Sequence, residues 1–313
     1  MKINSILTGF AHNLRRLPRI AWPALVGAVI LCCGNNAYAQ LPGNGFTVFS
    51  WGTTNDLNGI NIGSTSDRSC FLSGVSGNLD MGAQQGFDCG VNGQESLARV
   101  SPKLGGTDYF LVAHGGVCEN QFGQPVADNN PVNAEATCFL TNAGVQEGGT
   151  PAFGDPSVPV KLAELSTGNT NVRQCFLSGL FGVAGSWGSS STFARVRMVT
   201  AADSLHPTTG WYIDTNLKAA NDGSHPRVEG RCVDFPPTTH FTSGIIGKWR
   251  QTTTVTITSG KGVVKACALE MIEGAFNVNS WSDGVVMNFP SQVDGDWSIT
   301  LTAGKAAIWV CAQ

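Results

Sequence analysis

Three stretches of this chain begin with cysteine and then follow one pattern. Leucine stands two places after each cysteine, valine, leucine or isoleucine five places after, and glycine seven places after. The stretches are CFLSGVSG at Cys70, CFLSGLFG at Cys175 and CALEMIEG at Cys267. Three copies of a four-position pattern indicate an internal repeat, and their spacing gives each unit the size of a small domain.

The resemblance between the units continues downstream of each cysteine. A strand-like segment comes next, at SLARV (96–100), TFARV (192–196) and GVVMNF (284–289). A turn and an aromatic strand follow, around Tyr109, Trp211 and Trp297, and each unit then reaches another cysteine, at Cys138, Cys232 and Cys311. Segments such as TVTITS (254–259) alternate between glycine, asparagine and aspartate turn signals, which is typical of strands.

These features predict an all-β protein of three tandem, disulfide-closed antiparallel modules, each a small sandwich or open barrel. Their expected bounds are 40–150, with an extra disulfide-pinned insertion, 151–241 and 242–313. The alternative is one ring-like, pseudo-threefold β assembly. A β-bulge in each opening strand would bring its two apolar positions to one face, which the aromatic strand would cover, and the glycine suits a tight bend or a close backbone approach.

The repeat also predicts how the cysteines pair. Opening and closing cysteines should form Cys70–Cys138, Cys175–Cys232 and Cys267–Cys311, and Cys89–Cys118 should pin the insertion. Cys138 itself begins an opening-like string, CFLTNAG, so a pairing of Cys70 with Cys118 and of Cys89 with Cys138 stays open. Ten cysteines, two of them before residue 40, leave an even number for bridges, as an oxidising compartment requires.

Residues 1–39 have the composition of a secretory signal peptide. Basic residues at Lys2, Arg15, Arg16 and Arg19 precede the apolar run AWPALVGAVILCC and the cleavage pattern Ala37-Tyr38-Ala39. The run is too short to span a bilayer core of about 30 Å. We therefore expect a chain that starts at Gln40, has no transmembrane segment and is exported to the periplasm or the outside.

The charge of the chain bears on its partners. The whole sequence has 19 basic and 22 acidic residues, and because residues 1–39 hold four of the basic ones, the net charge of the remainder is −7. A chain of this kind without a basic cluster cannot neutralise a run of phosphates, which supplies most non-specific affinity for nucleic acid. Nucleic acid is therefore not expected as a partner.

Catalytic chemistry has few candidates in this sequence. HExxH, CxxC and DxDxDG motifs are missing, and we predict neither a metal nor a cofactor. The candidates are loop residues of the second module, Asp203, His206, Asp222 and His225, which could form a site if their loops converge; polar loop residues beside turns are the competing interpretation. AGSWG (184–188) has the form of a nucleophile elbow, but that motif requires a strand-to-helix turn. Nothing distinguishes Asp214 or Glu229 from surface charge.

Tryptophan offers the better indication of function. Trp187 and Trp281 stand in glycine- and serine-rich turns at nearly matching places of two repeats, where an exposed indole could stack on a sugar ring, although packing in the core is the competing interpretation. Trp211 and Trp297 begin aromatic strands and should fill the cores.

The function hypotheses follow from these tryptophans and the repeat. The first is an exported, non-catalytic binding protein for a glycan or a cell-surface polymer, whose repeated modules would provide avidity. The alternatives are a self-associating structural or adhesive component of an extracellular assembly, and a hydrolase with its site in the second module's loops.

Overall fold

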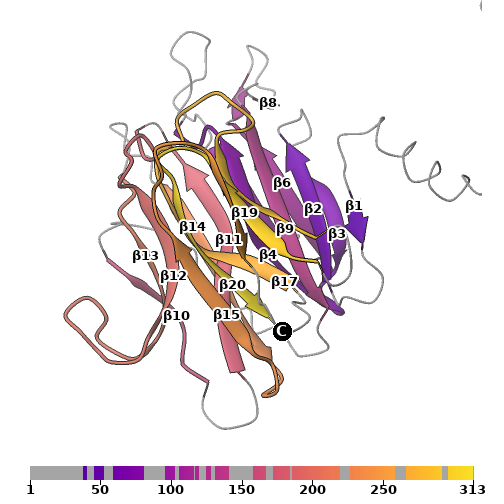
Figure 1. Cartoon of the computed structure of the whole chain (residues 1–313), viewed down its shortest axis with the longest axis vertical. Helices are drawn as coiled ribbons and strands as arrows, with labels where there is room; N and C mark the ends of the chain where they lie inside the picture. The colour runs from indigo at the N-terminus through magenta and orange to yellow at the C-terminus, as the bar shows by residue number, and fades with distance from the viewer. Residues whose placement is uncertain are drawn as a thin grey trace, which may run out of the picture. The chain divides into compact units, whose positions relative to one another are not determined.

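The computed structural model describes residues 38–40, 46–52, 59–80, 96–102, 106–115, 117–119, 125–127, 131–140, 158–166, 172–183, 185–218, 226–257, 266–290 and 295–312. Every regular element in these ranges is a strand (Figure 1), and the three larger sheets are antiparallel and open, which confirms the all-β prediction. None of the described residues forms a helix that is long and apolar enough to cross a membrane. The predicted signal peptide falls outside these ranges up to residue 37, and its expected cleavage site lies within β1 (Tyr38–Gln40).

Each repeat contributes four equivalent strands, which we call opening, second, third and closing. The opening strands are β4 (Arg68–Gly77), β11 (Val172–Gly182) and β17 (Ala266–Glu273). The second strands are β5 (Ser96–Pro102), β12 (Phe193–Val199) and β18 (Gly284–Asn288). The third strands are β6 (Asp108–His114), β13 (Gly210–Thr215) and β19 (Trp297–Leu301). The closing strands are β9 (Val132–Leu140), β14 (Arg227–Phe235) and β20 (Ala306–Ala312).

The remaining strands extend these sheets. Three of them pair with the third strands: β3 (Ile60–Ser64), β10 (Val160–Ala163) and β16 (Thr253–Ile257). Two pair with closing strands: β2 (Phe46–Gly52), which also carries β1, and β15 (Phe241–Ile246). A separate two-stranded ladder is formed by β7 (Val117–Glu119) and β8 (Pro125–Ala127).

Strands are exchanged between repeats in a cyclic order. Each opening strand pairs on one side with the closing strand of its own repeat and on the other with the second strand of the preceding repeat: β5 with β11, β12 with β17, and β18 with β4. Each sheet therefore contains strands from two repeats, and Tyr38–Gln313 forms one compact unit. The cyclic exchange is what the ring-like, pseudo-threefold alternative expects, and the module bounds stay a prediction.

The three disulfides expected from the repeat are present. Cys70–Cys138, Cys175–Cys232 and Cys267–Cys311 each join directly opposed residues of an opening and a closing strand, with Cα–Cα distances of 3.9, 3.9 and 4.0 Å. Cys138 is therefore a closing cysteine, and the alternative pairing of Cys70 with Cys118 is wrong. Cys89 lies outside the described residues, so the Cys89–Cys118 bridge stays a prediction. Three bridges indicate that the protein folds in an oxidising environment.

The predicted bulge occurs in all three opening strands. The register with the closing strand shifts immediately after the repeated leucine, so that one residue of each opening strand has no direct partner: Ser73, Ser178 and Glu270. One extra residue reverses the parity of the strand, and the apolar residues on either side of it therefore reach the same face.

Aromatic side chains occupy both faces of the opening hairpins. Tyr109, Trp211 and Trp297, from the third strands, are at most 3% exposed, as predicted for core positions. On the other face, Phe71 and Phe176 of two opening strands lie with ring centroids 4.6 Å apart. The three opening strands contact one another. Burial of each of these aromatic side chains contributes roughly 1.5–3 kcal/mol to stability.

The glycine seven places after the cysteine allows a close backbone approach. A Cβ on Gly182 would lie 1.6 Å from the carbonyl oxygen of Leu79. At Gly77, where φ is +100°, the corresponding contact with the carbonyl oxygen of Pro131 would be 1.9 Å. The end of each of these two strands therefore fits against neighbouring backbone only when the residue has no side chain.

We expect Gly182→Ala to lower the free energy of unfolding by about 2 kcal/mol, because the added methyl group forces the backbone at Leu79 to move. Urea denaturation followed by circular dichroism measures this change. Gly247→Ala is the matched control, since a Cβ there meets no atom within 4 Å and should leave stability within about 0.5 kcal/mol. Equal effects of the two substitutions would show that the close approach is not tight in solution.

Candidate functional site

Two of the four catalytic candidates lie in the connection between β12 and β13. His206 is 2% exposed, and its Nδ1 lies 2.9 Å from Oδ1 of Asp203. Its Nε2 lies 2.9 Å from Oδ1 of Asp214, on β13. The other two candidates, Asp222 and His225, lie outside the described residues, so the structure does not test whether they join this group.

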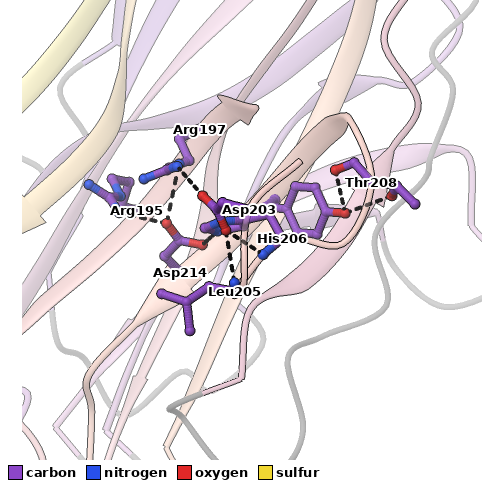
Figure 2. Close-up of polar contacts among 8 residues, drawn as sticks. Arg195, Arg197, Asp203, Leu205, His206, Thr208 and Asp214 are labelled. Carbon is purple, nitrogen blue, oxygen red and sulfur yellow. Dashed lines mark hydrogen bonds and ion pairs between the residues drawn. The ribbon is translucent and has the colours of Figure 1, made fainter. Parts of the chain in front are cut away.

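Arginines from β12 complete the network around His206. Arg195 donates from Nη2 to Asp214 at 2.6 Å, across a register pair of the β12–β13 ladder. Arg197 lies 3.5 Å from Asp214 and 3.8 Å from Asp203. Figure 2 shows Asp214 beside Arg195, and Arg197 in contact with both Asp214 and Asp203. The backbone N–H of His206 donates to Asp203, and this bond, followed by the side-chain bond of His206, lowers the pKa of Asp203.

This arrangement engages both nitrogens of the imidazole. A general base needs a nitrogen that faces a substrate proton, and a metal-ligating histidine leaves one nitrogen for the metal. Here each nitrogen contacts a carboxylate, and no group of three or more His, Cys, Asp or Glu side chains suited to a metal occurs among the described residues. The contacts fasten the β12–β13 connection to the hairpin, and Asp214 is the member that sequence reasoning did not single out.

Trp187 is buried, so for this residue the packing interpretation is right and the exposed, sugar-stacking interpretation is wrong. It is 0% exposed, and its ring meets that of Phe276 edge-on at 5.4 Å. Its carbonyl oxygen accepts a hydrogen bond from the N–H of Phe276. The carbonyl oxygen of Phe276 accepts a hydrogen bond from the N–H of Leu79. These three residues follow the ends of the three opening strands, so Trp187 fills the junction where the repeats meet and has no face available for a sugar.

The turn that carries Trp281 corresponds to a different part of the second repeat. Ser189 and Ser191 form a serine turn, Ser280 and Ser282 form the same turn, and each pair of hydroxyls lies 3.0 Å apart. Trp281 therefore corresponds to Ser190, between the two serines, and not to Trp187. At this outward position its side chain is 52% exposed.

A second exposed tryptophan, Trp249, precedes β16, at the same end of the seven-stranded sheet as Trp281, which precedes β18. Thr253 at the start of β16 pairs with Leu301, which also pairs with Val285 near the start of β18. Trp249 and Trp281 each lie four residues before these aligned positions, on connections that enter strands about 10 Å apart, two sheet spacings. Trp249 is also 52% exposed.

A buried ion pair fixes both connections. Lys305, in the turn between β19 and β20, lies 2.8 and 2.9 Å from the two carboxylate oxygens of Asp283, just after the Trp281 turn. Thr302 donates to the same carboxylate at 2.7 Å. In the same turn the N–H of Gly304 donates to the carbonyl oxygen of Trp249 at 2.9 Å. One turn therefore holds the backbones of both tryptophan-bearing segments.

We call Trp249, Val278 and Trp281 the tryptophan surface. Val278 belongs to the Trp281 connection and is 50% exposed. Large exposed apolar side chains at one end of a sheet are candidates for contact with a ligand or partner. The signal in the sequence for Trp249 was its polar neighbourhood, KWRQ, in which a lone tryptophan cannot belong to a buried strand.

No protein-family model matches the chain, and no curated protein is detectably similar to it. The interpretation of the site therefore depends on its own geometry. Among the described residues, the β12–β13 network holds an imidazole whose nitrogens are both engaged, whereas the tryptophan surface presents two large side chains that are half exposed. The second arrangement is the stronger candidate for contact with a ligand.

Proposed function

We propose that this is a non-catalytic protein that binds a glycan or cell-surface polymer on the tryptophan surface. The observation that carries the proposal is the pair Trp249 and Trp281, each 52% exposed, on connections held by one turn. An exported chain, as the sequence predicts, would meet such polymers in the periplasm or outside the cell.

The chemistry of the indole suits a sugar. One face of a pyranose ring presents C–H groups, which pack on the flat apolar face of an indole while the hydroxyl groups stay in water. The Lys305–Asp283 pair and the hydrogen bond from Gly304 to the Trp249 carbonyl oxygen already hold the two connections, so binding needs to order little further backbone. Two indoles on neighbouring connections can contact successive sugars of one chain.

The β12–β13 network argues against hydrolysis that depends on His206. A hydrolase at this place would need His206 to exchange a proton with substrate, yet the ring is buried between Asp203 and Asp214. The geometry favours a structural role for this histidine.

Single substitutions of the two tryptophans test the proposal. We expect Trp249→Ala and Trp281→Ala each to weaken glycan binding on the order of tenfold, which corresponds to about 1.4 kcal/mol of lost contact. A glycan array with the purified, disulfide-bonded protein identifies the ligand, and titration calorimetry measures affinity. Met198→Ala is the matched control, because Met198 is 53% exposed on β12, which belongs to a different sheet from β16 and β18.

Two results would contradict the proposal. One is silence of the wild-type protein across a broad array of neutral and acidic glycans. The other is an oligomer in size-exclusion light scattering that Trp281→Ala converts to a monomer, because the surface would then serve self-association in an extracellular assembly.

A further inference from the structure

Among the residues that the structure describes, the charged groups around the tryptophan surface are paired, with one exception. Lys248, immediately before Trp249, contacts Glu273, and Asp283 contacts Lys305. Arg250, immediately after Trp249, is exposed, and among the described residues no acidic side chain contacts it. The surface therefore carries one uncompensated positive charge, on a guanidinium next to an exposed indole.

This local charge is opposite to that of the protein as a whole. The chain beyond residue 39 has a net charge of −7, so its overall charge does not attract an anionic polymer. The carboxylate closest to the Trp281 turn is neutralised by Lys305 and by the hydroxyl of Thr302. An acidic ligand thus meets an attractive group at Arg250 and no free carboxylate at Asp283.

We propose that the ligand of the tryptophan surface is an acidic polysaccharide whose carboxylate groups pair with Arg250. This inference rests on the proposed glycan-binding function and names the class of glycan. The planar guanidinium offers two parallel N–H donors to a carboxylate, a geometry that lysine does not provide. A uronic acid stacked on Trp249 would place its carboxylate at the edge of the ring, where the neighbouring residue can reach it.

The experiment compares galacturonate oligomers with neutral galactose oligomers of equal length. The wild-type protein should bind the galacturonate oligomer at least tenfold more tightly at 20 mM NaCl, and the preference should shrink at 200 mM NaCl because salt screens the charge pair. Arg250→Gln should remove the preference and leave affinity for the neutral oligomer within twofold. Lys218→Gln, an exposed cation on another part of the chain, makes the same change in net charge and should keep the preference.

The outcomes separate this inference from the proposed function. If both oligomers bind equally, or if Arg250→Gln keeps the preference, the acidic-ligand inference is overturned while the glycan-binding function stands. If Lys218→Gln removes the preference as fully as Arg250→Gln, the effect is one of net charge and the role of Arg250 is overturned. If neither oligomer binds and a broad array is silent, both proposals fail.

Discussion

Replacing Cys175 and Cys232 together by alanine is expected to lower the free energy of unfolding by about 4 kcal/mol. The bridge spans a sequence separation of 57, and in the chain-entropy description a loop of this size restricts the unfolded chain by that amount. The loss should be felt by all three repeats. The β11–β14 pair supports β5 of the first repeat, and β12 of its own repeat supports β17 of the third.

Hydrogen exchange measured by mass spectrometry distinguishes a shared loss from a local one. Peptides from opening strands of all three repeats should lose protection together, and urea denaturation should remain a single transition. Replacing Cys267 and Cys311 should give the same pattern. Loss of protection confined to residues of the second repeat would contradict the coupling and would instead indicate three independently stable modules.

A second large effect is expected from two glutamates. Glu135→Gln combined with Glu270→Gln should make the protein roughly 3 kcal/mol more stable than the wild type at pH 8, about 1.5 kcal/mol per group after allowance for their partial contact with solvent. Burial raises the pKa of both carboxyls from 4.5 to about 7, and for Glu270 a hydrogen bond from Gln174 opposes the rise. Both carboxyls are therefore ionised at pH 8 at a cost in stability.

The sign of the pH dependence follows from those pKa values. Between pH 4.5 and 7 the folded chain holds protons that the unfolded chain has released, so these groups stabilise the protein at acidic pH and lose that contribution as the pH rises. The advantage of the double variant should therefore grow over this interval and be constant above it. Burial lowers the pKa of His114 to about 4, which gives the opposite slope, but this contribution is common to both proteins. A stability difference that does not change between pH 4 and 8 would contradict the prediction.

Comparison of the repeats shows which cationic partner is missing at Glu135. In the second repeat, Glu229 pairs with Arg99 of the neighbouring second strand at 2.7 Å. Glu135 occupies the equivalent place in the first repeat, but the neighbouring second strand has Val286 there. Val286→Arg should consequently supply the missing partner, lower the pKa of Glu135 and stabilise the protein above pH 7.

The sequence was sufficient to predict the strand order, the bulge and the described disulfide within one repeat. The position of the bulge, the three described disulfides and the buried aromatic residues follow from strand parity and from the spacing around each cysteine. The pairing of strands from different repeats could not be predicted, because the edge of an opening strand can pair equally well with a strand of its own repeat or of another. Parity fixes which face is buried, but not which neighbour lies alongside.

The candidate site shows the same limit of prediction from local sequence. Trp187 and Trp281 have similar neighbours in sequence, but a shift of three residues in the turn places one at a junction and the other in solvent. Trp249 and Asp214 gain their importance from contacts across strands, which no local pattern records. Since Trp281 corresponds to Ser190 in the second repeat, the tryptophan surface is not repeated there.

Cyclic pairing also sets the order in which this chain can complete itself. Strand β4 lies early in the sequence, but one of its edges pairs only with β18, near the end of the chain. Asn78 and Asn279, which form a hydrogen bond beside this pairing, are 201 positions apart. Such distant contacts slow folding, and a waiting edge invites pairing with another chain. A polypeptide that lacks its last seventy or so residues would thus expose an unpaired edge of β4, and aggregation of such a fragment is the expected hazard of this strand order.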